Sequence, residues 1–141
     1  MRNIFQALAF VSLLLPGIGH AQLAKLTIRV QALDPTTGSV EVSLFNSADT
    51  FMKKPMVQQS KEVNGNAELV FEFSGLLDGA YAAVAVHDEN GNGVLDNGFL
   101  GMGGESYGYS NDAGPWLGRP SFEAATFLLG TEDLEITFQV D

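Results

Sequence analysis

A period-two alternation of apolar and polar residues runs through most of this 141-residue chain and restricts what it can fold into. The alternation is clear in the segments 26–30, 40–44, 67–73 and 134–140. Side chains two residues apart lie on one face of a β-strand, whereas an amphipathic helix repeats its apolar positions every three or four residues. The pattern therefore predicts an all-β protein built from half-buried strands.

The segment 81–86 is apolar on both faces and departs from this alternation. Its alanines would suit a helix, but Val84 and Val86 are β-branched, and turn residues flank the segment at both ends. These features favour a strand. Because both of its faces are apolar, we expect this strand to be central and covered on both sides.

Turn residues mark where the predicted strands end and how they connect. Asp34–Gly38 contains a proline and a glycine, so the strands at 26–30 and 40–44 are predicted to form a hairpin. The segments 126–129 and 134–140 are predicted to form the last strand pair. Short strands at this spacing, with hardly any helix, predict a single antiparallel β-sandwich of immunoglobulin-like or transthyretin-like type, with one long glycine-rich loop.

Residues 1–21 have the composition of a secretory signal peptide. Arg2 supplies a positive charge, an apolar run follows, and small residues occupy the cleavage positions before Gln22. The apolar run is shorter than the roughly 20 residues that cross a bilayer, and no second stretch is long enough to span one. The sequence predicts export to the periplasm or the outside, with residues 22–141 forming the β-sandwich domain. The alternative is a retained N-terminal anchor.

The composition limits the partners of the protein. The chain has no cysteine, so no disulfide framework supports the fold despite the predicted export. A formal net charge of −10 disfavours nucleic acid and anionic membrane surfaces and suits cations, although acidity can also serve solubility alone. With a single histidine after the predicted signal peptide and no cysteine, the chain lacks the usual zinc ligands.

The segment 88–96 has the spacing of a calcium-binding loop. Oxygen-bearing side chains alternate around a glycine that permits a sharp turn, and Ca²⁺ is held by roughly six to eight oxygen atoms. The predicted metal ligands are the side chains of Asp88, Asn90, Asn92 and Asp96 and the backbone carbonyl of Val94. Water, or a carboxylate brought in by the fold such as Glu105 or Asp112, can complete the shell.

Two features separate this loop from an EF-hand. The twelfth position, which carries a bidentate glutamate in an EF-hand, is Phe99, and a predicted strand rather than a helix precedes the loop. We therefore expect weak affinity, with a dissociation constant on the order of 10⁻⁴ to 10⁻³ M. The alternative is a loop of Asn-Gly turns that needs no metal.

His87 raises the alternative of an enzyme. A small secreted hydrolase would use His87 with loop carboxylates, and Ser106 and Ser110 lie in the same region. A lone histidine at a strand end is usually a hydrogen-bonded structural residue, and the sequence has no Gly-x-Ser-x-Gly motif. The sequence favours a non-enzymatic binding or structural module, with the hydrolase and a metal-free envelope interaction protein as alternatives.

Glycine and aromatic residues are concentrated between Gly91 and Gly118. A long irregular segment in a compact domain is often functional, and aromatic faces here, including Trp116, can bind a glycan or a protein ligand. The alternative, which we favour, is that the aromatic side chains pack back over an open edge of the sandwich.

A joined set of motifs resembles a known family. The motifs are Val84-Ala85-Val86-His87-Asp88-Glu89-Asn90-Gly91-Asn92-Gly93 with Asp96, Phe99-Leu100-Gly101 with Glu105, Tyr107-Gly108-Tyr109-Ser110-Asn111, and Pro120-Ser121-Phe122-Glu123-Ala124-Ala125. Over most of the predicted mature chain they resemble the exported bacterial family catalogued as domain of unknown function 2141. The resemblance implies a small periplasmic or secreted β-sandwich and no established activity.

A looser resemblance concerns the segment 77–86. It is similar to the Leu-x-x-Gly-x-Tyr strand of transthyretin-like and carboxypeptidase-regulatory-like modules, although Asp78 stands where those modules frequently carry proline. This resemblance implies an accessory or adhesion domain, and a shared fold does not by itself assign a function.

Overall fold

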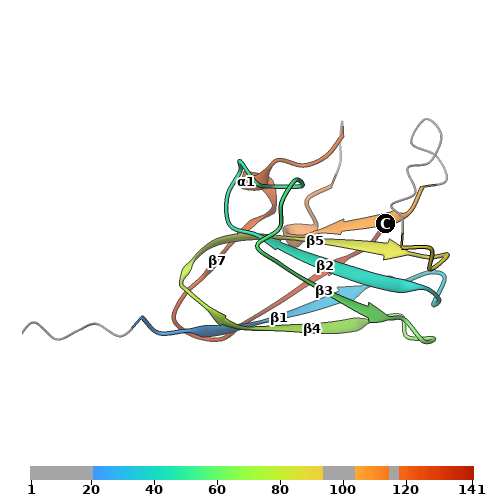
Figure 1. The fold of residues 1–141 in the computed structure, drawn as a ribbon, viewed down its shortest axis with the longest axis horizontal. Helices are drawn as coiled ribbons and strands as arrows, with labels where there is room; N and C mark the ends of the chain where they lie inside the picture. Colours follow the sequence, from blue (N-terminus) through green and yellow to red (C-terminus); the bar gives the residue numbers. More distant parts are fainter. Residues whose placement is uncertain (1–20, 94–103, 115–117) are drawn as a thin grey trace, which may run out of the picture.

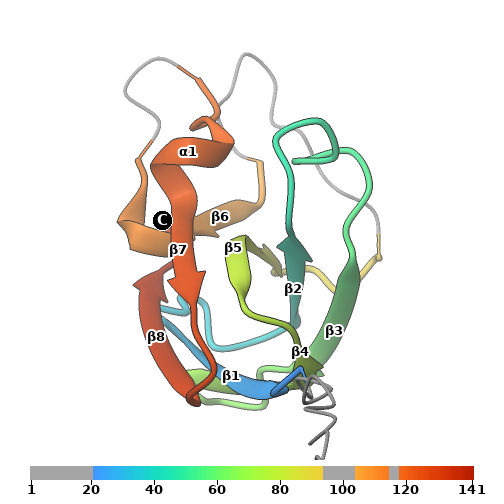
Figure 2. The same ribbon diagram turned by 90° about the vertical axis from the view of Figure 1, so that its left-hand side faces the viewer.

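The computed structural model describes residues 21–93, 104–114 and 118–141. These residues form two packed β-sheets with little helix (Figures 1 and 2). The elements are β1 (Ala24–Gln31), β2 (Ser39–Phe45), β3 (Val57–Glu62), β4 (Leu69–Leu76), β5 (Gly79–Asp88), β6 (Ser106–Tyr109), the 3-10 turn η1 (Ser110–Asp112), α1 (Phe122–Ala125), β7 (Thr126–Leu129) and β8 (Leu134–Gln139). The prediction of an all-β sandwich is confirmed.

The strands are divided between a smaller and a larger sheet. The smaller sheet has the order β4-β1-β8, and the larger sheet has the order β3-β2-β5-β6, with β7 also paired to β5. β1 pairs in parallel with β8, whereas the other described pairs are antiparallel. Figure 2 shows β1 and β4 at the bottom of the view and β8 at its left-hand side.

The inner faces of the two sheets enclose the main hydrophobic core, and β5 lies at the centre of the larger sheet. β1 alternates buried and half-buried residues along its whole length, as its sequence predicts. In β5, Ala83 and Ala85 face the main core, while Ala82 and Val84 belong to a second cluster on the outer face of the sheet. The prediction of a central strand covered on both sides is confirmed.

The second cluster covers only part of that outer face. Phe51 lies between Phe45 and Phe122, with ring centroids 5.3 and 5.8 Å apart in edge-to-face arrangements. The side chain of Ser121 caps α1 by accepting a hydrogen bond from a main-chain amide of the helix at 3.2 Å. α1 lies over the outer face near β6 and β7 (Figure 2). The aromatic cluster therefore covers the outer face beside Ala82 and leaves the end of β5 available for a functional site.

Two predicted strand pairs are wrong. The hairpin of 26–30 with 40–44 does not form, because β1 lies in the smaller sheet and β2 in the larger one. The pair of 126–129 with 134–140 does not form, because β7 pairs with β5 and β8 pairs with β1. Alternation identifies the buried face of a strand but not its partner, since both sheets bury their apolar faces in the same core.

β6 and β7 lie one after the other along the same side of β5. β6 pairs with residues 84–87 of β5 and β7 with residues 79–82, so Ala83 falls between the two registers. The buried hydroxyl of Ser110 fills this gap. It accepts a hydrogen bond from the Ala83 amide at 2.9 Å and lies within hydrogen-bonding distance of the carbonyls of Ala83 and Ala125. A side chain thus completes the sheet where the backbone pairing is interrupted.

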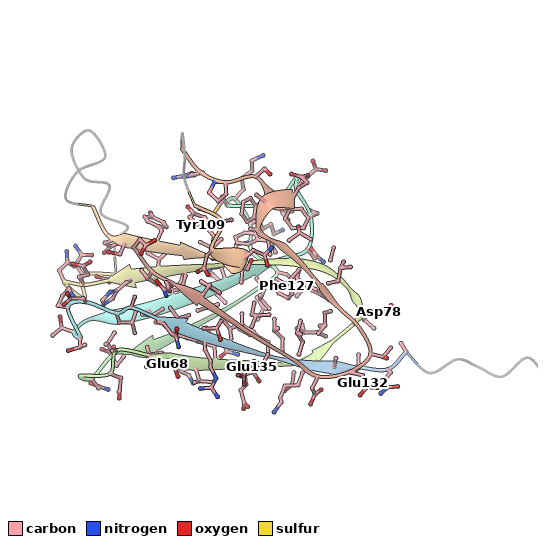
Figure 3. The ribbon with its side chains drawn as sticks, turned by 180° about the vertical axis from the view of Figure 1, so that it is seen from behind. Glu68, Asp78, Tyr109, Phe127, Glu132 and Glu135 are labelled. Carbon is pink, nitrogen blue, oxygen red and sulfur yellow. The ribbon has the colours of Figure 1, made fainter. Side chains whose placement is uncertain are left out.

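The outer face of the smaller sheet is charged. Arg29 donates hydrogen bonds to Glu68 at 3.0 Å and to Glu135 at 2.8 Å, and the two glutamates lie on the same face in Figure 3. Exposed ion pairs of this kind typically contribute between about 0 and 1 kcal/mol. We therefore interpret this face as solvated.

The open side between the edge strands β3 and β4 is joined by side chains. Gln59 of β3 donates a hydrogen bond to the carbonyl of Glu72 at 2.7 Å, and Lys61 donates one to the carbonyl of Val70. Unpaired backbone groups at a sheet edge favour association with other chains. These contacts occupy two such carbonyls of β4.

The predicted signal peptide, apart from Ala21, lies outside the described residues. Within the described ranges, no helix combines the length and the apolar composition that a bilayer crossing requires.

Candidate functional site

The predicted calcium loop begins where β5 ends. Asp88 is the last residue of β5 and lies opposite Ser39 of β2. Asp88 has the same strand parity as Val84, so its side chain lies on the outer face of the larger sheet. The loop ends at β6, whose first residue, Ser106, donates a hydrogen bond to the carboxylate of Glu89 at 3.0 Å. This bond joins the two ends of the loop.

The carboxylate of Asp88 organises the first part of the loop. Its two oxygens accept hydrogen bonds from the amides of Gly91 at 2.7 Å and Gly93 at 2.8 Å. Both glycines have a φ of 69°, a conformation that costs glycine little. The side-chain oxygen of Asn90 accepts a hydrogen bond from the amide of Asn92 at 2.9 Å. The chain is therefore wrapped around Asp88 by the oxygen-bearing residues that the sequence pattern identifies.

Glu105 lies beside Asp88. Burial raises the pKa of Asp88, but hydrogen bonds from the amides of Gly93 and Gly91, together with the neighbouring Glu105, outweigh this effect, and the pKa is lowered from its usual value. Two carboxylates placed close together repel each other. A bound cation relieves the same repulsion.

A pocket of about 290 Å³ lies beside Asp88 on the outer face of the larger sheet. Its lining residues are Ser39, Glu41, Ser60, Val86, Asp88, Gly93 and Glu105. Sequence analysis identifies Asp88 and Glu105 as candidates and misses Glu41. Glu41 reaches the site because it lies opposite Val86 in the pairing of β2 with β5. Glu41 is a polar residue in an alternating segment, which predicts that it faces outward. Only the register of β2 against β5 places it at this pocket.

The five predicted calcium ligands are only partly described. Asp88, Asn90 and Asn92 lie in the described part of the loop, whereas Val94 and Asp96 lie outside the described residues. Among the described residues, no group of three or more His, Cys, Asp or Glu side chains is arranged to hold a metal ion, so the carboxyl groups line the pocket without converging on one point. The five-residue calcium site stays a prediction.

The two carboxylates considered for completing the metal shell differ in position. Glu105 lies beside Asp88 in the pocket. Asp112 instead accepts a hydrogen bond from the amide of Gln139 at 2.9 Å, next to the end of β8. Glu105 is therefore the additional carboxylate that the fold places at the candidate site.

His87 is fully buried and lies on the core side of β5. Its Nε2 donates a hydrogen bond to the carbonyl of Thr37 at 2.8 Å, and its Nδ1 has no hydrogen-bond partner among the described residues. This bond fixes the end of β5 to the turn before β2, where Gly38 packs so closely against the backbone of Asp88 that a side chain would overlap it. A base must come within hydrogen-bond reach of its substrate, and His87 in this position gives the hydrolase alternative no support.

The residues of the Tyr107–Asn111 motif have structural roles. Gly108 packs against the backbone of Gln139 so closely that any side chain would overlap it. Ser110 fills the gap between β6 and β7, and the side-chain amide of Asn111 donates a hydrogen bond to the carbonyl of Thr126 at 2.8 Å. The family-like motif thus joins three elements that are distant in the sequence.

The aromatic residues of the Gly91–Gly118 segment are described in part. Tyr109 is 7% exposed and packs in the outer cluster, as the packing interpretation expects. Tyr107 is half-buried beside it, with the two rings nearly parallel at 11° and their centroids 6.5 Å apart. Phe99 and Trp116 lie outside the described residues. The binding interpretation for Trp116 stays a prediction.

The chain was compared with protein families, with curated proteins and with solved structures. Residues 28–137 match the model of DUF2141, a family described as an uncharacterized protein conserved in bacteria. The match includes β5, the Asp88 loop, β6 and most of β8. No curated protein and no solved structure matches the chain.

Proposed function

The chain belongs to this family of uncharacterised bacterial proteins, and we propose, from its own residues, that it is an exported, non-enzymatic binding or structural module whose β5–β6 loop binds Ca²⁺. The proposed ligands are Asp88, Asn90, Asn92 and Asp96 through their side chains and Val94 through its carbonyl oxygen. Calcium would order the loop, and the Gly91–Gly118 segment would present the surface for a glycan or a protein ligand.

The position of Asp88 and Glu105 in the lining of one pocket carries this proposal. Glu41 also lines this pocket, and the chain has a formal net charge of −10. A divalent cation bound between the two carboxylates would remove their repulsion. Ca²⁺ suits the site because it accepts carboxylate, amide and carbonyl oxygens in a flexible geometry.

The Asp88 hydrogen bonds support calcium for a second reason. The amides of Gly91 and Gly93 keep Asp88 in its ionised form, which is the form that binds a cation. They also hold the first part of the loop in place before any cation arrives. The position of Glu105 in the same pocket explains how a loop without the EF-hand glutamate would gain a further carboxylate.

Thermal unfolding of the purified protein during a calcium titration tests the proposal. We expect the melting temperature to rise and to saturate in the millimolar range, with a stabilisation of about 1.4 kcal/mol when free calcium is ten times the dissociation constant. Asp88→Asn and Glu105→Gln should each remove most of this response, because each removes one of the two neighbouring carboxylates.

Asp49→Asn is the matched control, since it makes the same charge change at an exposed residue outside the loop. It should respond to calcium as the natural chain does. A melting temperature that is unchanged up to several millimolar calcium, in a protein whose loop amides are protected from exchange, would rule out the calcium site. An equal loss of response in Asp49→Asn would show that the response comes from overall charge.

A negative calcium result would leave the metal-free envelope interaction protein as the better proposal. The prediction of export is separate from the proposal of a metal site, because it depends on residues 1–21 rather than on the loop. A protein recovered from the periplasm or the medium would support export whatever the outcome of the titration.

A further inference from the structure

A second pocket, of about 330 Å³, lies where β6 meets the end of β8. Its chemically distinctive lining residues are Tyr107, Tyr109, Asp112, Arg119, Gln139 and Asp141. The volume is at the lower end of the range for small-molecule sites, which starts at about 300 Å³. None of these residues lines the pocket beside Asp88. The two sites can therefore be tested separately.

Backbone contacts hold the walls of this pocket in place. Tyr107 and Asp141 exchange two backbone hydrogen bonds, at 3.2 and 3.0 Å. The carboxylate of Asp112 accepts a hydrogen bond from the amide of Gln139 at 2.9 Å, and Gly108 lets the two backbones approach closely. A site whose walls are fixed in advance loses less entropy when a ligand binds.

One wall of the pocket is aromatic. The rings of Tyr107 and Tyr109 are nearly parallel, and Tyr107 is the more exposed of the two, so Tyr109 supports it from behind. The hydroxyl of Tyr107 is enclosed and has no hydrogen-bond partner among the described residues. Buried hydroxyl groups are normally paired with protein, water or a ligand.

The rim of the pocket combines hydrogen-bond donors and acceptors. Burial raises the pKa of the Tyr107 and Tyr109 phenols, and the charge of nearby Arg119 acts in the opposite direction on both. Arg119 lines the same pocket, where its guanidinium group can donate hydrogen bonds to a ligand. Asp112 and Asp141 supply hydrogen-bond acceptors, and the side-chain amide of Gln139 supplies both donors and an acceptor.

We propose, resting on the ligand surface proposed above for the Gly91–Gly118 segment, that this pocket binds a neutral saccharide, with a sugar ring against Tyr107 and its hydroxyl groups paired with Arg119, Asp112 and Gln139. A sugar has an apolar C–H face that packs on an aromatic ring, and its hydroxyl groups both donate and accept hydrogen bonds. An anion would meet two aspartates on a chain with a net charge of −10, and an organic cation would meet Arg119. The mixed rim therefore favours a ligand without charge.

Amide chemical-shift mapping on the purified, ¹⁵N-labelled protein tests this assignment. The probes are cellobiose, maltose and N,N′-diacetylchitobiose, with choline and glucose 6-phosphate as charged comparisons, all in EDTA. We expect at least one neutral sugar to shift the amides of residues 107–109 and 139–141. Because EDTA keeps calcium from the loop, binding in this experiment reports on the pocket alone, and a failure here is distinguishable from a failure of the calcium titration.

Three variants locate the interaction. Tyr107→Ala should weaken binding by about tenfold or more through loss of the aromatic wall, whereas Tyr107→Phe keeps the wall and should weaken binding less, through loss of the hydroxyl group alone. Arg119→Gln changes an exposed residue and should weaken binding severalfold, so it decides the matter if Tyr107→Ala does not fold.

Three results would overturn the proposal. No shift at these amides with any neutral sugar at about 10 mM would exclude a saccharide site of useful affinity. Shifts with choline or glucose 6-phosphate alone would assign the pocket to a charged ligand. Sugar-dependent shifts that are unaffected by both Tyr107→Ala and Arg119→Gln would place the binding elsewhere on the protein.

Discussion

The hydroxyl oxygen of Ser110 lies 2.9 Å from the backbone nitrogen of Ala83, at the point where β6 has ended and β7 has not yet begun. Both residues are fully buried. A buried backbone amide without a partner is costly, and here a side chain provides the hydrogen bond that a neighbouring strand would otherwise make. The Tyr107–Asn111 motif thus supports the sheet from which the Asp88 loop extends.

Ser110→Ala should lower the free energy of unfolding by about 1–3 kcal/mol, because the amide of Ala83 loses its partner in a buried position. Urea unfolding followed by circular dichroism measures the change. Ser74→Ala makes the same substitution at an exposed position of β4 and should stay within about 0.5 kcal/mol of the natural chain. Equal stability of the two variants would contradict the role given to Ser110.

Gly108→Ala should destabilise the fold by about 1–3 kcal/mol or more, because the added methyl group overlaps the backbone of Gln139. Gly130→Ala is the matched control, since a side chain there meets no atom of the described structure within 4 Å. The measurement is again urea unfolding. If both glycine variants unfold at the same urea concentration, β6 and β8 do not approach as closely as described.

The Asp88 loop should loosen at acid pH. The pKa of Asp88 is lowered from 3.8 in the folded protein, because hydrogen bonds from Gly93 and Gly91 outweigh the opposing effect of burial. The ionised carboxylate therefore stabilises the loop above pH 3.8, and this contribution is lost as the pH falls through the folded pKa. As the pH falls through the folded pKa of Asp88, we expect the Gly91 and Gly93 amides to lose their protection from hydrogen exchange before other amides do.

Hydrogen exchange at a series of pH values measures this effect, with the central β5 amide of Ala85 as an internal reference. The Ala85 amide should keep its protection over the pH range in which the glycine amides lose theirs. Asp88→Asn should abolish the pH-dependent step. A step that persists in this variant would mean that another acid controls the loop.

His87→Ala should destabilise the protein by about 1–3 kcal/mol, because it removes a fully buried side chain together with its hydrogen bond to the carbonyl of Thr37. A panel of ester, amide and glycoside substrates should show no hydrolysis by either protein. Turnover by the natural chain that disappears in a folded His87→Ala variant would revive the hydrolase alternative.

Expression in a bacterial host should give a product that begins at Gln22. Intact-mass spectrometry of the protein from the periplasm or the medium measures the N-terminus, and the cleavage rule for small residues gives this position. Replacing Ala21 with an arginine should block processing. A full-length product in the same fraction would favour the retained anchor.

The sequence predicts the sandwich and the central place of β5 because these properties depend on neighbouring residues. Alternation decides which side chains of β1 are buried, and the two apolar faces of β5 indicate cover on both sides. The alternation of the sequence does not predict β6 or α1, because both are short and are held by contacts such as that of Ser110 with Ala83. The predicted hairpins are wrong because adjacent strands in the chain enter different sheets.

The sequence by itself determines the oxygen spacing from Asp88 to Asn92 and the glycines that fold the chain around it, since these act within a few residues. Only the tertiary structure decides that Glu105 and Glu41 line the same pocket as Asp88, and that β1 runs parallel to β8. These contacts join residues far apart in the chain. The shared core and the strand register bring them together, and neither is encoded by any single segment.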